Sequence, residues 1–158
     1  LFGLSDHCKL ASNWSEGELE INTSPTMGTA GGNLCQWNEV SIYPQTKKDD
    51  KASIIFETGS LEQLVEVIGN PRLRVILKSK DPEAFIVTRL CDALPDGRST
   101  RIPMVTHQLS SNGGIVEHKS LAPNKIYEIE LELDGVTHLF AKGHPICLAL
   151  SNTYWPML

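Results

Sequence analysis

The side chains that could do chemistry in this 158-residue chain are widely spaced. A serine hydrolase of the α/β fold presents its nucleophile within Gly-x-Ser-x-Gly, because the glycines allow the sharp turn that exposes the hydroxyl. The nearest match is Gly3-Leu4-Ser5-Asp6-His7, which lacks the second glycine. We therefore predict that no catalytic serine is present, and we interpret Ser5 as part of a frayed terminus.

Histidines are the next candidates, because imidazole is a common metal ligand. His107, His118, His138 and His144 are scattered, without a His-x-His pair or a His-Glu-x-x-His motif. The spacing predicts no metal site. Convergence of these histidines in space is the alternative, and it would make the chain a metal-dependent enzyme on a β-sandwich.

The acidic and glycine-rich segments do not match known calcium- or phosphate-binding motifs. Glu128, Glu130 and Glu132 alternate along one stretch, which indicates a solvated strand face rather than a calcium site. Gly28 and Gly31–Gly32 lack the Lys-Ser/Thr pair of a phosphate-binding loop. We expect no cofactor.

The four cysteines are Cys8, Cys35, Cys91 and Cys147, and none forms a Cys-x-x-Cys motif. This spacing indicates neither a zinc site nor a redox motif. Cys91 and Cys147 lie in apolar runs, where cysteine acts as a small hydrophobic residue. The even count leaves disulfides open. The compartment also stays open, with the cytoplasm favoured.

Composition narrows the class of protein. The net charge is −5, 41% of residues are hydrophobic and 21% are charged, as in an ordinary globular domain. The acidic balance argues against nucleic acid and anionic lipid as partners. No apolar run approaches the roughly 20 residues of a membrane span. Because the chain starts at Leu1 without Met, we expect a fragment of a larger protein.

The pattern of apolar residues predicts one β-sandwich domain over 1–158, with a loop-rich part (1–51) and a strand-rich core (52–158). In the first part only Glu18–Ile21 alternates as a strand does, and Thr23–Gly32 indicates a loop. Pro95 and Asp96-Gly97 predict a turn after a strand. About eight strands without an amphipathic helix favour a two-sheet jelly roll. The expected core strands are 52–58, 61–68, 73–78, 85–91, 127–133, 136–140 and 146–150.

Aromatic residues suggest binding. Trp14, Trp37 and Tyr43 lie in the loop-rich part and could stack on a sugar ring or a partner surface, although an aromatic side chain under a loop more often contacts the core. They carry the alternative function, a free-standing carbohydrate-binding module. Tyr154 and Trp155 lie in an aromatic segment near the end of the chain, which we expect to pack against a neighbouring domain.

Three segments in order resemble one family. Phe85–Thr100 resembles the pattern L-x-D-V-x-P-D-G-R, Leu121–Leu131 resembles L-x-P-G-x-x-Y-x-V-x-I-x-L, and Phe140–Pro156 resembles F-x-x-G-H-R-I-R-L-x-I-S-x-x-Y-W-P. These patterns belong to the C-terminal domain of X-Pro dipeptidyl-peptidases and cocaine esterase-like (CocE/NonD) hydrolases. The resemblance covers roughly Ala52–Leu158.

The resemblance implies a galactose-binding-like jelly roll that follows an α/β-hydrolase domain. In this family the catalytic serine, acid and histidine lie upstream, and the jelly roll covers and helps to shape the active site. It often takes part in subunit contacts as well. The hydrolases cleave esters or amides, including X-Pro dipeptides at peptide N-termini. The resemblance therefore implies a non-catalytic domain with an upstream hydrolase domain as its partner.

The residues that match the family patterns are expected to be structural. We expect Arg98 to pair with a nearby carboxylate such as Asp92, and His144 to be a hydrogen-bonded packing residue. The chain departs from the family at Pro145 and Cys147, where two arginines are lost. The stretch 101–108 looks shortened, and the last strands of the family are expected to be missing after Leu158. The full set is Asp92, Pro95, Asp96, Gly97, Arg98, Gly143, His144, Tyr154, Trp155 and Pro156.

Overall fold

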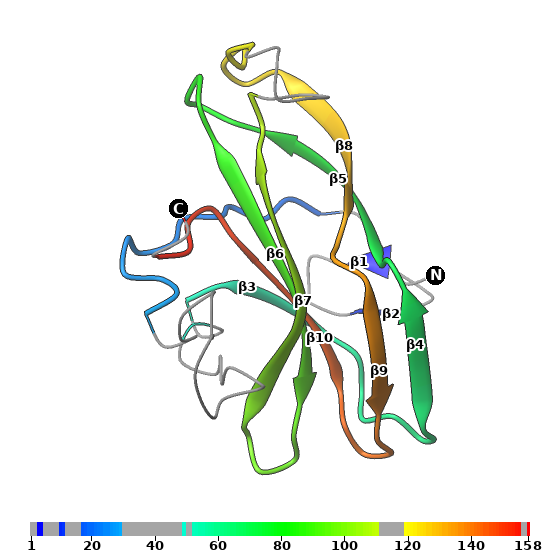
Figure 1. Cartoon of the computed structure of the whole chain (residues 1–158). Helices are drawn as coiled ribbons and strands as arrows, with labels where there is room; N and C mark the ends of the chain where they lie inside the picture. Colours follow the sequence, from blue (N-terminus) through cyan, green and yellow to red (C-terminus); the bar gives the residue numbers. More distant parts are fainter. Residues whose placement is uncertain are drawn as a thin grey trace.

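The strands that the structure describes pair in antiparallel fashion (Figure 1). The computed structural model describes residues 3–4, 10–11, 17–29, 49, 52–110, 119–155 and 158. Within these residues, no helix is long and apolar enough to cross a membrane. The strands are β1 (Gly3–Leu4), β2 (Leu10–Ala11), β3 (Ile54–Glu57), β4 (Val65–Gly69), β5 (Arg72–Lys78), β6 (Phe85–Ala93), β7 (Ser99–Gln108), β8 (Ile126–Glu132), β9 (Val136–Phe140) and β10 (Ile146–Ser151).

Four strands form the main sheet in the order β3-β10-β6-β7. β10 lies between β3 and β6, and all six of its residues are buried. β7 pairs with β6 through a bulge, where Ile102 and Pro103 oppose the single residue Leu90. Proline has no N–H to donate to a ladder, so it is tolerated at such a bulge.

The second layer is a long two-stranded ribbon in which β4 pairs with β9 and β5 pairs with β8. Gly69 lies opposite Val136, and Arg72 lies opposite Glu132. Between these two pairs, residues 70–71 lie opposite residues 133–135, so one side of the ribbon has an extra residue. The side-chain amide of Asn70 donates to the carbonyl oxygen at 133 across this irregularity, at 3.2 Å. The ribbon therefore changes register by one residue where its two halves meet.

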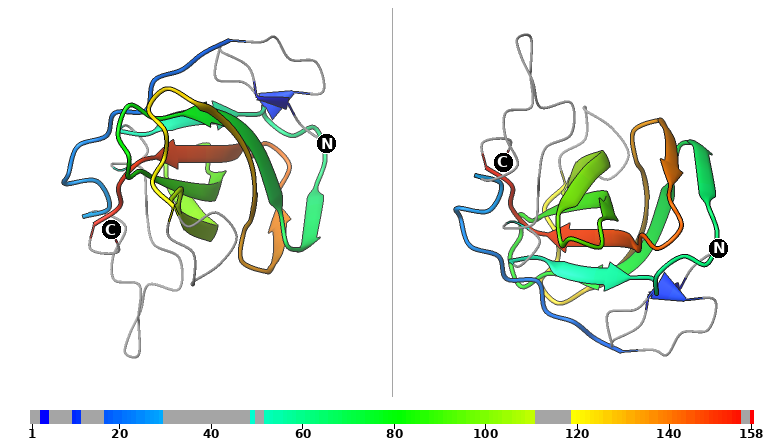
Figure 2. Two further views of the ribbon diagram at one scale, coloured as in Figure 1. Left: turned by 90° about the horizontal axis from the view of Figure 1, so that it is seen from above. Right: turned by 90° about the horizontal axis from the view of Figure 1, so that it is seen from below.

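The core lies between the main sheet and the ribbon (Figure 2). Alternation places one face of each strand inward, so burial of these apolar side chains holds the two layers together. The structure is thus an all-β sandwich, as predicted. Its buried apolar residues are Phe56, Leu73, Ile86, Leu109, Leu121, Ile129, Leu131, Leu133, Leu148 and Leu150.

The strands predicted from Ala52 onward are confirmed, and eight strands run from β3 to β10. The strand predicted at Glu18–Ile21 is wrong. The segment carries no strand assignment; Glu18 and Glu20 instead form side-chain ion pairs with Lys78 and Lys80, at 3.1 and 3.2 Å. The stretch 101–108 belongs to the ten-residue β7. The jelly-roll connection pattern stays a prediction.

Candidate functional site

The two turns that carry the family-like motifs lie at the same end of the sandwich, at the bottom of Figure 1. In the turn between β6 and β7, the Leu94 N–H donates to the Arg98 carbonyl and the Gly97 N–H donates to the Leu94 carbonyl, both at 2.8 Å. Gly97 has a φ of 82°, a conformation that glycine adopts without strain. The turn predicted at Asp96-Gly97 is confirmed.

Arg98 pairs with a nearby carboxylate, as expected, but this carboxylate is Asp96, and the expectation of Asp92 is wrong. The Arg98 side chain donates from Nε to Asp96 Oδ2 at 2.7 Å, and its backbone N–H donates to Asp96 Oδ1 at 3.0 Å. An aspartate in a turn bonds to groups two residues further along, so the local partner is reached first. Arg98 and Asp96 are largely exposed.

Asp92 instead joins two histidines. Its Oδ1 lies 2.8 Å from His144 Nδ1 and its Oδ2 lies 3.0 Å from His138 Nε2. Asp92 is at the end of β6, His138 is on β9 and His144 is in the connection from β9 to β10. The buried carboxylate therefore bonds the main sheet to the ribbon through Oδ2 and to the β9–β10 connection through Oδ1. We call these three residues the Asp92 cluster.

The expectation that His144 is a hydrogen-bonded packing residue agrees with this geometry. The sequence did not predict that His138 binds the same carboxylate as His144. The ring of His138 also packs edge-on against Phe140, with 4.7 Å between the ring centroids. Because 46 residues separate His138 from Asp92, only a correct pairing of β9 near β6 could have predicted their contact.

An open hollow of about 520 Å³ lies beside the motif turns. Its ionisable lining side chains are Glu57, Arg98 and the thiol Cys147. The lining thus includes one carboxylate and one guanidinium. The remaining lining residues are Ile55, Ser60, Ala93, Leu94, Pro95, Gly97, Ser99, Gly143 and Pro145.

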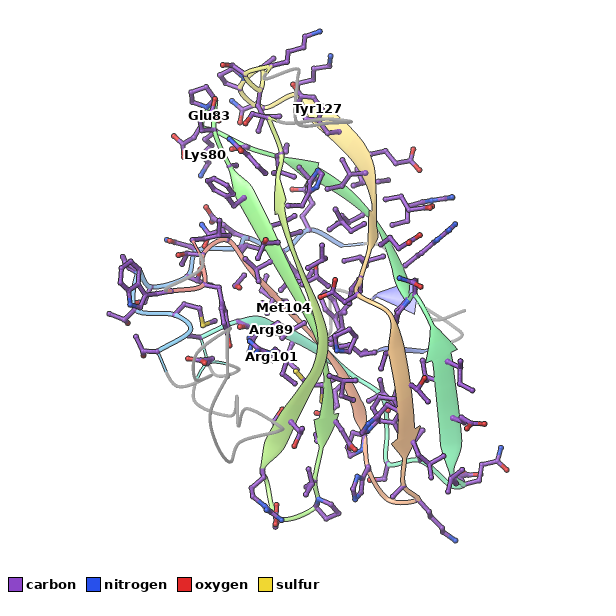
Figure 3. All side chains as sticks on the ribbon, viewed as in Figure 1. Lys80, Glu83, Arg89, Arg101, Met104 and Tyr127 are labelled. Atoms are coloured by element: carbon purple, nitrogen blue, oxygen red, sulfur yellow. The ribbon has the colours of Figure 1, made fainter. Side chains whose placement is uncertain are left out.

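The outer face of the main sheet carries a second polar cluster, built around a fully buried arginine. Arg89 on β6 donates from Nη2 to Ser53 Oγ at 2.6 Å, and its guanidinium carbon lies 5.1 Å from the centre of the Tyr154 ring. Arg101 Nη1 lies 3.7 Å from Met104 Sδ and 3.5 Å from the Tyr154 hydroxyl. Figure 3 shows Arg89, Arg101 and Met104 together across the middle of β6 and β7.

Burial raises the pKa of Tyr154 above its usual value, and the positive charges of Arg89 and Arg101 oppose this shift. Tyr154 packs with Met27, Val87 and Met104 inside this domain. The expectation that it packs against a neighbouring domain is therefore wrong for Tyr154. The ring of Tyr154 is buried against the sheet, whereas Trp155 is 56% exposed.

The other predicted residues take separate positions. His107 lies on β7, and burial lowers its pKa. Within the described ranges no group of three or more His, Cys, Asp or Glu side chains, the Asp92 cluster included, has an arrangement that could hold a metal ion. The glutamates of β8 face the arginines of β5; the ion pairs are Arg72–Glu130, Arg72–Glu132, Arg74–Glu128 and Arg74–Glu130.

Several predicted residues lie outside the described part of the chain. These are Ser5, His7, Trp14, Trp37, Tyr43, His118 and Pro156, together with Cys8, Cys35 and residues 30–32. The structure therefore adds nothing to the carbohydrate-binding alternative.

Fold and site define an all-β sandwich domain closed at one end by a carboxylate bonded to two histidines. The model of the X-Pro dipeptidyl-peptidase C-terminal non-catalytic domain matches residues 6–158. The chain belongs to this family.

Known relatives are longer proteins. The cocaine esterase of Rhodococcus sp. (strain MB1 Bresler) is 23% identical over 103 residues, which cover 65% of this chain and 18% of the esterase. An aminopeptidase from a marine sediment Thaumarchaeota archaeon has a TM-score of 0.78 at 16% identity, over 99% of this chain and 29% of that one. An α-amino acid ester hydrolase has a TM-score of 0.80 at 14% identity, over 98% and 29%. This chain thus spans less than a third of each of these relatives.

Proposed function

We propose that this domain covers the active site of an α/β-hydrolase domain that precedes it in the whole protein, and that it helps the protein to assemble. The observation that carries the proposal is the match of the non-catalytic family over residues 6–158, together with relatives of which the chain spans 29% or less. Esters or amides are the proposed substrates of the whole protein.

The outer face of β4 and β9 is the surface that we propose for docking on the catalytic domain. Leu64 directly precedes β4, Glu66 and Ile68 lie two and four residues further along, and Leu139 on β9 lies opposite Glu66. Residues two apart on a strand share a face. Leu64, Ile68 and Leu139 are all more than half exposed. Such a row of apolar side chains is stabilised when another protein surface removes it from water.

A reactive-probe experiment tests the proposed catalytic partner. An extract of the source is labelled with a serine-reactive fluorophosphonate, and this domain is detected by antibody on the same gel. We expect one labelled band several-fold heavier than 17.4 kDa. An unlabelled band near 17.4 kDa would contradict the proposal and leave the chain as a stand-alone protein.

Two matched variants test the docking surface in the whole protein. Ile68 on β4 and Ile76 on β5 are 70% and 69% exposed, so Ile76→Lys controls for the introduction of a charge on the ribbon. We expect Ile68→Lys to lower ester hydrolysis and to speed release of this domain by a protease. Equal effects of both variants, or none from either, would count against docking through β4 and β9.

A further inference from the structure

Two cysteines that are 56 positions apart in sequence lie directly opposite each other in the main sheet. Cys91 on β6 pairs with Cys147 on β10 in the antiparallel register. Residues directly opposite in such a pair project to the same face of the sheet. Both side chains are buried thiols.

The backbone hydrogen bonds fix the type of pair that the two cysteines form. The N–H of Ala93 donates to the carbonyl of Pro145 at 3.2 Å, two residues further along the same ladder. Narrow hydrogen-bonded pairs recur every second residue, so Cys91 and Cys147 also occupy one. The Cα atoms of such a pair lie about 5.5 Å apart. Disulfides span Cα separations of about 4.4–6.8 Å, and this pair lies within that range. The Cβ atoms of a hydrogen-bonded pair stand near the wide end of about 4.5–5.5 Å, so the two strands must move together by about 1 Å for the bond to close.

The two buried thiols differ slightly in exposure, which is 6% for Cys147 and 0% for Cys91. Cys147 lines the open hollow beside the motif turns. Cys91 has no exposed surface, and it is not part of the lining. A small oxidant entering the hollow therefore meets Cys147 first, with Cys91 opposite it across the ladder.

We propose that Cys91 and Cys147 form a redox modification site, at which hydrogen peroxide converts the two thiols into a disulfide between β6 and β10. In the first step the Cys147 thiolate attacks one peroxide oxygen, the O–O bond breaks, hydroxide leaves and a sulfenic acid remains. In the second step the Cys91 thiolate attacks the sulfenic sulfur, the S–S bond forms and the second hydroxide leaves. The two thiol protons and the two hydroxides give two waters, and the peroxide takes up the two electrons.

The disulfide would act on the end of the sandwich that carries the motifs. Cys91 directly precedes Asp92, and Cys147 lies three residues after His144. The cross-link ties together the strand ends from which the carboxylate and one of its histidines project.

Peptide mapping of the oxidised chain tests the proposal. The full chain with Cys8→Ser and Cys35→Ser is treated with hydrogen peroxide, blocked with N-ethylmaleimide under denaturing conditions, and digested without reductant. We expect one linked peptide pair containing Cys91 and Cys147, two hydrogens lighter than the sum of its parts and lost on addition of dithiothreitol. Recovery of both cysteines as maleimide adducts, or of Cys147 as sulfinic acid beside alkylated Cys91, would overturn the proposal.

Two single-cysteine variants test the order of the two oxidation steps. The peptide mapping described above stands independently of these variants. In Cys91→Ser we expect Cys147 to stop at the sulfenic acid, which dimedone traps as a stable adduct. In Cys147→Ser we expect Cys91 to remain a thiol at the same peroxide exposure, because it does not line the hollow. Oxidation of Cys91 at an undiminished rate in Cys147→Ser would overturn the assignment of Cys147 as the first site of attack.

Discussion

Replacing Asp92 tests whether its carboxylate fastens the two layers together. In Asp92→Ala both histidines lose their acceptor, whereas Asp92→Asn keeps one oxygen and places an amide NH₂ against the other ring. His138 and His144 lie 2.8–3.0 Å from the carboxylate oxygens. Because the three residues come from β6, β9 and the connection after β9, the alanine variant removes both side-chain hydrogen bonds that join β6 to these two segments.

The magnitude follows from the two hydrogen bonds. A hydrogen bond to a charged group contributes about 1.5–3 kcal/mol. The side chains of His138 and His144 are 19% and 22% exposed, so water replaces part of what each loses. We expect Asp92→Ala to lower the free energy of unfolding by about 3 kcal/mol, and Asp92→Asn by about half as much. At about 2–4 °C per kcal/mol for a chain of this size, Asp92→Ala lowers the melting temperature by about 6–12 °C.

The assay is urea unfolding of the full chain at pH 7, followed by far-ultraviolet circular dichroism. Glu128→Gln is the matched control, because it changes an exposed carboxylate on β8 whose nearest cation is Arg74 at 3.8 Å. Exposed pairs contribute about 0–1 kcal/mol. A result for Asp92→Ala that is indistinguishable from the control would refute the reasoning, because the two hydrogen bonds would then contribute no net stability.

Three further predictions concern single positions. Gly97→Val is expected to lower the free energy of unfolding by about 1–3 kcal/mol, because valine is strained at a φ of 82°; Gly59→Val, where a Cβ meets no atom within 4 Å, is the control, and equal midpoints in urea would contradict the prediction. Gly28→Ala is expected to lower the melting temperature clearly, because Gly28 has a φ of 97° and the new methyl group would overlap the carbonyl oxygen of Trp155. An unchanged melting temperature would show that this contact is absent. Because the pKa of Tyr154 is raised from 10.0, the folded state keeps the phenol proton that the unfolded state releases, so stability falls as the pH rises above about 10; Tyr154→Phe should show a smaller fall between pH 9 and 11, and an identical fall would be evidence against the shift.

The regular strands could be predicted because their burial alternates in sequence. Tyr127, Ile129 and Leu131 face inward while the glutamates between them face outward, and this pattern needs no knowledge of the partner strand. β10 could be predicted as well, since a short run of apolar residues such as Ile146–Leu150 is typical of a strand covered on both sides. In both cases the signal lies within a few residues.

The polar contacts could be predicted only in part, because their partners are distant in sequence. Asp92 bonds to His138 and His144, which are 46 and 52 residues away in sequence. Arg98 instead bonds to the carboxylate of Asp96, two residues before it. Arg89 is completely buried within β6, and the one sequence signal for this was a lone arginine inside an apolar strand. Glu18 alternates as a strand residue would, but its segment is held by side chains instead of a backbone ladder.

The position of β10 in the middle of the main sheet has a consequence for synthesis on the ribosome. β3 and β6 both pair with β10, so neither can complete its ladder until residues 146–151 have been made. At about 5–20 residues per second, the interval between the end of β6 at Ala93 and the start of β10 at Ile146 lasts about 3–10 s. During that interval β3 and β6 each have an unpaired backbone edge where β10 will bind. The nascent domain is therefore at its most vulnerable to chaperone capture and misassembly just before its centre strand is translated.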